Sequence, residues 1–255
     1  AEGNIGIITV NEFSRDVGAD VFAAWGEIQR EASGRINGLV LDLRSNPGGS
    51  LDEAVALSDL FLDEGRIVSQ RGRAQGESLS YNAETMYRGQ IAADVPLIVL
   101  IDAGSASASE IVAGALQDHR RALIMGERSF GKGSVQSLVP LGSDAALKLT
   151  TARYFTPKGH SVQEGGIKPD IRVPQISDPD LERRMKYQLR ESDLRGHLIN
   201  EAELKDDDLE RDLKADPRFS QTAEELKEQG IEDFQLDYAI KTLRRTTSSS
   251  VALRK

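Results

Sequence analysis

Two residues of this sequence have the types and the setting for nucleophilic catalysis. Ser107 lies in the segment 104–110 (GSASASE), and Lys132 follows 25 residues later, between Gly131 and Gly133. A serine hydroxyl becomes a useful nucleophile only when a base takes its proton, and a lysine amine held away from water can be that base. The pair therefore indicates a hydrolase that combines serine with lysine, not with histidine.

The segment around Ser107 also has a purely structural interpretation. Residues 107–110 match the S-x-x-E capping box with which many helices begin. A helix that begins after a buried strand places its first side chain at the carboxyl edge of a sheet, where α/β enzymes bind ligands. The N–H groups at such a helix start favour a developing negative charge. Spacing alone leaves Ser105 and Ser109 as alternatives to Ser107.

A glycine-rich turn and a glutamine are further candidates. The turn 44–49 (RSNPGG) follows a buried stretch, and Asn-Pro and Gly-Gly are ordinary turn sequences. Glycine also lets backbone N–H groups point at a ligand oxygen, so this turn can contribute to a site. Gln136 lies four residues after Lys132, and its amide oxygen could orient the lysine ammonium if the two are close.

Two other motifs include Lys132. Residues 126–132 spell G-x-x-x-x-G-K, most of a phosphate-binding P-loop, so a nucleotide-binding module is an alternative. However, Gly133 stands where the magnesium-binding Ser or Thr should be, and a strand is expected next instead of a helix. Residues 129–132 spell the S-x-x-K of penicillin-binding enzymes, a motif that needs a helix, which Gly131 and Gly133 disfavour.

The composition excludes several classes of protein. The formal net charge is −9, whereas a general nucleic-acid binder is usually basic. The absence of cysteine excludes disulfides and thiol catalysis. His119, His160 and His197 stand in no strong motif, a triad through His160 has no support, and no cluster has the spacing of metal ligands. No stretch approaches the roughly 20 apolar residues of a membrane span.

The apolar pattern predicts alternating strands and helices over residues 5–174. Strands are expected at 5–10, 38–43, 66–71, 78–81, 96–101, 122–125, 135–140 and 147–155, and helices at 20–32, 51–62 and 107–119. The last two strands are expected to pair through the turn at residues 142–144 (GSD). Alternation of this kind implies an α/β fold, with a largely parallel sheet covered by helices.

The composition changes after Pro174. A charged helix is expected from Asp178 through about Arg195, and residues 201–216 are highly charged. Four apolar residues at helical spacing predict a last helix: Leu236, Ala239, Ile240 and Leu243. We therefore divide the chain into a core, residues 1–174, and a charged, mostly helical appendage, residues 175–255. The apolar stripe packs either on the core or on the same region of a second copy.

Four segments resemble the carboxyl-terminal processing peptidases, also called tail-specific proteases. They are residues 38–49 (GLVLDLRSNPGG), 104–115 (GSASASEIVAGA), 129–136 (SFGKGSVQ) and 154–170 (YFTPKGHSVQEGGIKPD). The segments occur in the family's order and cover most of residues 5–174, so together they are highly specific. The resemblance implies a crotonase-like (ClpP/crotonase-type) core, with Ser107 as nucleophile, Lys132 as general base and Gln136 as the partner that orients the lysine.

The resemblance also implies the rest of the machinery. The N–H of Ala108, with that of Gly48 or Gly49, would form the oxyanion hole. Substrates would be proteins or peptides cleaved near their C-termini, in the periplasm or cell envelope, without a metal or organic cofactor. Family members usually carry a PDZ domain before the segment that begins here at Gly3, and we expect no PDZ domain among these 255 residues. A non-catalytic scaffold with the peptidase fold is a further alternative.

Overall fold

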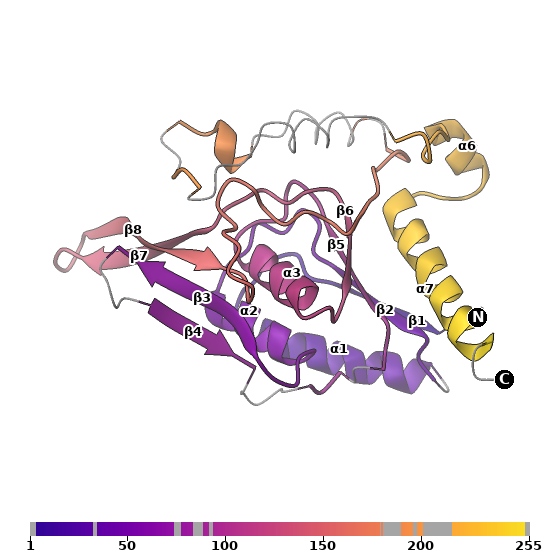
Figure 1. Ribbon diagram of the computed structural model, residues 1–255, viewed down its shortest axis with the longest axis horizontal. Helices are drawn as coiled ribbons and strands as arrows, with labels where there is room; N and C mark the ends of the chain where they lie inside the picture. The colour runs from indigo at the N-terminus through magenta and orange to yellow at the C-terminus, as the bar shows by residue number, and fades with distance from the viewer. Residues whose placement is uncertain are drawn as a thin grey trace.

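The computed structural model describes residues 4–32, 35–73, 78–83, 89–91, 94–178, 180, 190–195, 198–200 and 216–252 (Figure 1). These residues form a mixed α/β fold with two sheets. No helix among them is both long and apolar enough to cross a membrane.

The first sheet has five strands in the order β1-β2-β5-β6-β9, and all neighbouring strands are parallel. They are β1 (Ile5–Thr9), β2 (Gly38–Asp42), β5 (Leu97–Ile101), β6 (Leu123–Gly126) and β9 (Ile171–Arg172). Every residue of β2 and β5 is buried, as expected for parallel strands covered on both faces. Because the strands are parallel, the segments that follow β2, β5 and β6 leave the sheet at one edge.

Three helices cover one face of this sheet: α1 (Val17–Glu31), α2 (Leu51–Asp59) and α3 (Ala108–Asp118). The larger apolar cluster lies between these helices and alternate strand residues such as Leu39, Leu41 and Val99. Helix α3 has nine buried residues out of eleven, so it is held on nearly all sides. This rigid placement fixes the position of the residue just before it, Ser107.

The opposite face of the sheet is covered by the C-terminal segment, where α7 (Phe234–Ala252) follows α6 (Ala223–Glu228) (Figure 1). The other set of strand residues, including Val40 and Leu100, packs there against buried Ala239 and Leu243. The last helix therefore packs on the chain's own sheet, which is one of the two arrangements predicted from its apolar stripe.

The second sheet is antiparallel, with the order β4-β3-β8-β7. Its strands are β3 (Arg66–Gly72), β4 (Ser78–Asn82), β7 (Ser134–Pro140) and β8 (Ala146–Phe155). The pairing of β7 with β8 was predicted from the turn between them. The pairing of β3 with β8 was not, because it joins segments more than 70 residues apart, as between Ser69 and Phe155.

The helix predicted from Asp178 to about Arg195 falls mostly outside the described residues. Its predicted end is wrong: Glu191–Asp193 is a short 3-10 helix (η1), flanked by extended residues. The physical reason is a competing contact, since the Glu191 N–H donates to the Phe130 carbonyl at 3.2 Å. The charged segment 201–215 and His197 also lie outside the described residues.

Candidate active site

Ser107 occupies the sharp turn between β5 and α3. Its backbone has φ 54° and ψ −108°, a strained conformation for a residue with a side chain. Strain of this kind occurs where a strand-to-helix turn holds a nucleophile above a sheet. Ser107 is half-buried, whereas its neighbours Ala106 and Ala108 are buried. The fold therefore places Ser107 at the carboxyl edge of the parallel sheet with part of its surface accessible.

The two alternative serines have structural roles. Ser105 is fully buried, and its hydroxyl donates to the Leu43 carbonyl at 2.8 Å. Ser109 is also fully buried, and its hydroxyl donates to the Asn46 carbonyl at 3.0 Å. Both hydroxyls thus tie the start of α3 to the turn after β2. Of the three serines, Ser107 is the one that a substrate could reach.

A single buried carboxylate, Glu110, holds Ser107 and Lys132 together. Its Oε2 accepts hydrogen bonds from the N–H groups of Ser107, at 2.8 Å, and Lys132, at 2.9 Å. Its Oε1 accepts from the Ser129 hydroxyl at 2.6 Å and from the Gly131 N–H at 2.7 Å. Because one oxygen binds both backbone nitrogens, their separation cannot exceed the sum of 2.8 and 2.9 Å.

Burial raises the pKa of Glu110 to about 7, although its four hydrogen bonds favour the charged form and oppose the shift. An ionised carboxylate can accept from all four donors, whereas a protonated one must turn an O–H toward a group that is itself a donor. The sequence identified Glu110 only as the fourth residue of a capping box. Its contacts with Ser129, Gly131 and Lys132 had no sequence signal, because they come from a different loop.

The structure places the predicted base and its predicted partner on neighbouring segments. Lys132 is half-buried just before β7, and Gln136 is exposed on β7 opposite Thr150. Among the contacts of the described residues, no hydrogen bond joins the Lys132 amine to the Ser107 hydroxyl or to Gln136. The backbones of Ser107 and Lys132 are thus brought together, while the side-chain dyad and the role of Gln136 stay predictions.

Gly48 makes the closest approach of the glycine-rich turn to Ser107. Its φ is +100°, and a Cβ there would lie 2.8 Å from Ser107 Cβ and 2.9 Å from the Ala108 nitrogen. It would also lie 2.6 Å from the Ala106 carbonyl oxygen. A side chain at position 48 would therefore collide with the start of α3, so this position requires glycine.

The predicted oxyanion donors differ in availability. Ala108 is the first residue of α3, so its N–H has no acceptor within the helix. The Gly48 N–H already donates to Asn46 Oδ1 at 2.8 Å. The Gly49 N–H donates to no other residue in the described part of the chain. Gly48 therefore lies against Ser107, whereas the Gly49 N–H is the one that remains available to a ligand oxygen.

The alternative motifs around Lys132 lack the local structure they need. Strand β7 begins at Ser134, directly after Gly133, so neither the P-loop motif nor the S-x-x-K motif opens a helix here. Within the described ranges, no group of three or more His, Cys, Asp or Glu side chains could hold a metal ion. The geometry is that of a serine beside a lysine loop, with backbone N–H groups at the start of a helix.

Comparison with known families agrees with this geometry. The sequence profile of Peptidase family S41 matches residues 4–173, which include the parallel sheet and all the predicted site residues. This chain belongs to peptidase family S41. The resemblance seen in the sequence is thereby confirmed at the level of the family.

Individual relatives of this S41 chain carry more specific names. It is 50% identical over 203 residues to the carboxy-terminal-processing protease of Bartonella bacilliformis, covering 79% of this chain and 46% of that one. It is 43% identical over 171 residues to the carboxyl-terminal-processing protease of a Picosynechococcus species, covering 67% and 39%. The solved photosystem II D1 C-terminal processing protease is 35% identical, with a TM-score of 0.61, and the match covers 71% and 46%. The chain thus spans less than half the length of each of these relatives.

Proposed function

We propose that this chain is the catalytic portion of a serine endopeptidase that cleaves protein substrates near their C-termini with a Ser107–Lys132 dyad. The observation that carries the proposal is the Glu110 carboxylate, whose Oε2 binds the backbone N–H of both residues. The relatives named carboxyl-terminal-processing proteases support the substrate class.

The chemistry follows from the roles of these groups. Neutral Lys132 takes the proton of the Ser107 hydroxyl as its oxygen attacks the scissile carbonyl. The oxyanion of the tetrahedral intermediate accepts from the Ala108 N–H and from an N–H of the Gly48–Gly49 turn. Lys132 then protonates the leaving amine, and water hydrolyses the ester on Ser107 by the same route in reverse. Gln136 orients the Lys132 amine.

The remaining parts of the proposal rest on the family. The proposed architecture is a crotonase-like core, residues 1–174, followed by the charged, mostly helical region expected at residues 175–255. The substrate is a protein or peptide bound by its C-terminal region, in the periplasm or cell envelope. A second copy of the chain, joined through faces of the C-terminal helices that do not pack on the sheet, is an additional proposed partner.

Single substitutions test the dyad. Ser107→Ala and Lys132→Ala should each lower the rate of cleavage of an unfolded protein by about a thousand-fold or more. Ser220→Ala and Lys227→Ala are the matched controls, because both side chains are exposed on the C-terminal segment. They should leave the rate unchanged. Wild-type cleavage by purified Ser107→Ala or Lys132→Ala would refute the dyad.

A fluorophosphonate probe separates the remaining alternatives. The Ser107 oxygen should displace fluoride from phosphorus, and the mass of the adduct should be lost in Ser107→Ala. Wild-type protein that neither reacts with the probe nor cleaves a substrate would indicate a non-catalytic scaffold. Saturable binding of ATP with magnesium would indicate the nucleotide-binding alternative at residues 126–132.

A further inference from the structure

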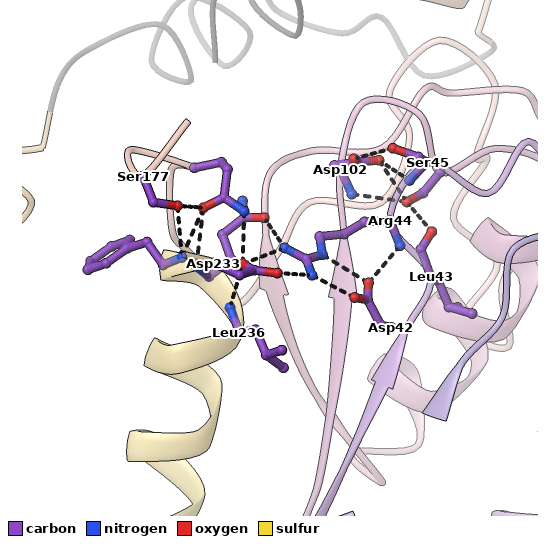
Figure 2. Close-up of polar contacts among 12 residues, drawn as sticks. Asp42, Leu43, Arg44, Ser45, Asp102, Ser177, Asp233 and Leu236 are labelled. Carbon is purple, nitrogen blue, oxygen red and sulfur yellow. Dashed lines mark hydrogen bonds and ion pairs between the residues drawn. The ribbon is translucent and has the colours of Figure 1, made fainter. Parts of the chain in front are cut away.

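Arg44, the first residue of the glycine-rich turn, is held by the C-terminal helix. Its guanidinium has five N–H donors, and each has an acceptor (Figure 2). Asp42 accepts at 2.9 and 2.6 Å, and Asp233 accepts at 2.9 and 2.7 Å on the other side. Gln235 accepts the fifth bond at 3.0 Å. Arg44 is therefore fixed between the end of β2 and the start of α7.

Asp233 is itself held by the C-terminal segment. Its Oδ1 accepts from Gln175 Nε2 at 2.8 Å and from the Leu236 N–H at 3.1 Å, so it also caps α7 (Figure 2). Burial alone would raise the pKa of Asp233, but the hydrogen bonds and charge of Arg44, together with the bonds from Gln175 and the Leu236 N–H, outweigh the burial and lower the pKa. The carboxylate thus stays charged at neutral pH and binds Arg44 as an ion pair.

The residue after Arg44 is fixed in a strained conformation. Ser45 has φ 55°, and its N–H and hydroxyl donate to the two oxygens of Asp102, at 2.8 and 3.2 Å. Asp102 follows β5 and also accepts from the Gly104 N–H at 2.8 Å. A side chain on Gly104 would collide with the Ser45 Cα, 2.8 Å away. The turn after β2 and the loop before Ser107 are thus packed backbone to backbone.

Asn46, the next residue, connects this turn to the residues on either side of Ser107. The Asn46 carbonyl accepts from the Ala106 N–H at 2.9 Å, directly before Ser107, and from the Ser109 hydroxyl at 3.0 Å. The Asn46 side chain accepts the Gly48 N–H. The contacts of residues 44–46 therefore connect the Asp233 ion pair with Gly48, which lies against Ser107.

We infer that Asp233 is a positioning residue for the hydrolytic site, which it serves through Arg44 by fixing the glycine-rich turn against the start of α3. The inference rests on the proposed function, because the turn matters as a source of oxyanion donors. It gives the N-terminal end of α7 a role in positioning the site, although the helix lies on the far face of the sheet.

Asp233→Asn tests this role with the helix cap retained, since asparagine caps helices as well as aspartate does. The substitution removes the charge and turns an amide NH₂ toward the guanidinium. It should lower kcat and the rate of fluorophosphonate labelling of Ser107 by about ten- to a hundred-fold, with KM changed by less than about three-fold. Asp233→Glu, which restores the carboxylate, should recover part of the lost rate.

Leu243→Ala is the matched control on the same helix. Leu243 lies about three turns farther along α7 and packs over Gly38. Its truncation should lower Tm by roughly 5–15 °C through lost packing, with kcat unchanged at temperatures where the variant is fully folded.

The outcomes separate this inference from the proposed function. A folded Asp233→Asn protein with wild-type kcat and labelling rate would overturn the inference. So would a fall in kcat of the same size in Leu243→Ala, because helix stability would then be the cause.

If Asp233→Asn does not fold, Gln235→Met provides a second test, because it removes one acceptor of Arg44. It should give a smaller fall in kcat, and an unchanged kcat would again overturn the inference. Failure of the proposed function appears differently, as cleavage that survives Ser107→Ala.

Discussion

Glu110 concentrates four hydrogen bonds on one buried carboxylate, and two of them hold the backbones of Ser107 and Lys132. Glutamine has nearly the same shape but can accept through only one oxygen, and its NH₂ faces donors. We therefore expect Glu110→Gln to lower kcat by roughly ten- to a hundred-fold, as a misplaced catalytic group does. Kinetics with a peptide substrate measure this, and a kcat within two-fold of wild type would contradict it.

The raised pKa of Glu110 predicts opposite effects of pH on stability and activity. The unfolded chain releases this proton near the ordinary value of 4.5, whereas the folded protein keeps it until about pH 7. The stabilisation that Glu110 contributes is thus present below pH 4.5 and is lost as pH rises through about 7, by roughly 3 kcal/mol. Activity should instead rise as pH passes through about 7, because the carboxylate of the folded protein ionises there and only the ionised form accepts from all four donors.

Urea unfolding at pH 5 and pH 8 checks the stability part. For each protein, the free energy of unfolding at pH 8 is subtracted from that at pH 5. This difference should be larger for wild type than for Glu110→Gln. Equal pH dependence of the two proteins would show that Glu110 does not titrate in this range.

At the scale of the element, the glycine-rich turn must lie directly against the start of α3. Gly48→Ala introduces a Cβ that would collide with atoms of Ala106, Ser107 and Ala108. These are backbone atoms and one Cβ, so they cannot move aside without a shift of the backbone. We expect at least a hundred-fold loss of kcat, since a shift of about 1 Å at a reacting group costs that much. Gly230→Ala is the control, because Gly230 also has a positive φ but has open space around it. A kcat loss of equal size in both variants would show that the backbone strain of a positive φ, and not the collision with the start of α3, causes the loss.

At the scale of the whole molecule, α7 completes the second face of the parallel sheet (Figure 1). Ala239 and Leu243 are buried there, while Leu236 and Ile240 are half-buried. The double variant Leu236→Asp, Ile240→Asp should therefore lower Tm at an unchanged molecular mass, measured by light scattering. A fall from dimer to folded monomer would instead place the stripe in an interface between copies.

Features that depend on neighbouring residues could be predicted from the sequence. Continuous apolar runs predicted β2 and β5, and the turn at 142–144 predicted the β7–β8 hairpin, because these patterns follow from local burial and backbone geometry. Helix ends were less predictable. Helix α1 begins at Val17 and not at Asp20, because the Glu53 side chain of α2 accepts the N–H groups of Asp16 and Gly18 at its start.

The tertiary structure alone decided which of three neighbouring serines is accessible and what holds it. Ser105 and Ser109 are distinguished from Ser107 by their full burial and by their bonds to the turn after β2. Glu110 meets Lys132 across 22 residues, and Arg44 meets Asp233 across 189. Sequence periodicity reports how a segment buries its own side chains, whereas such bonds depend on which loops the fold brings to one edge of the sheet.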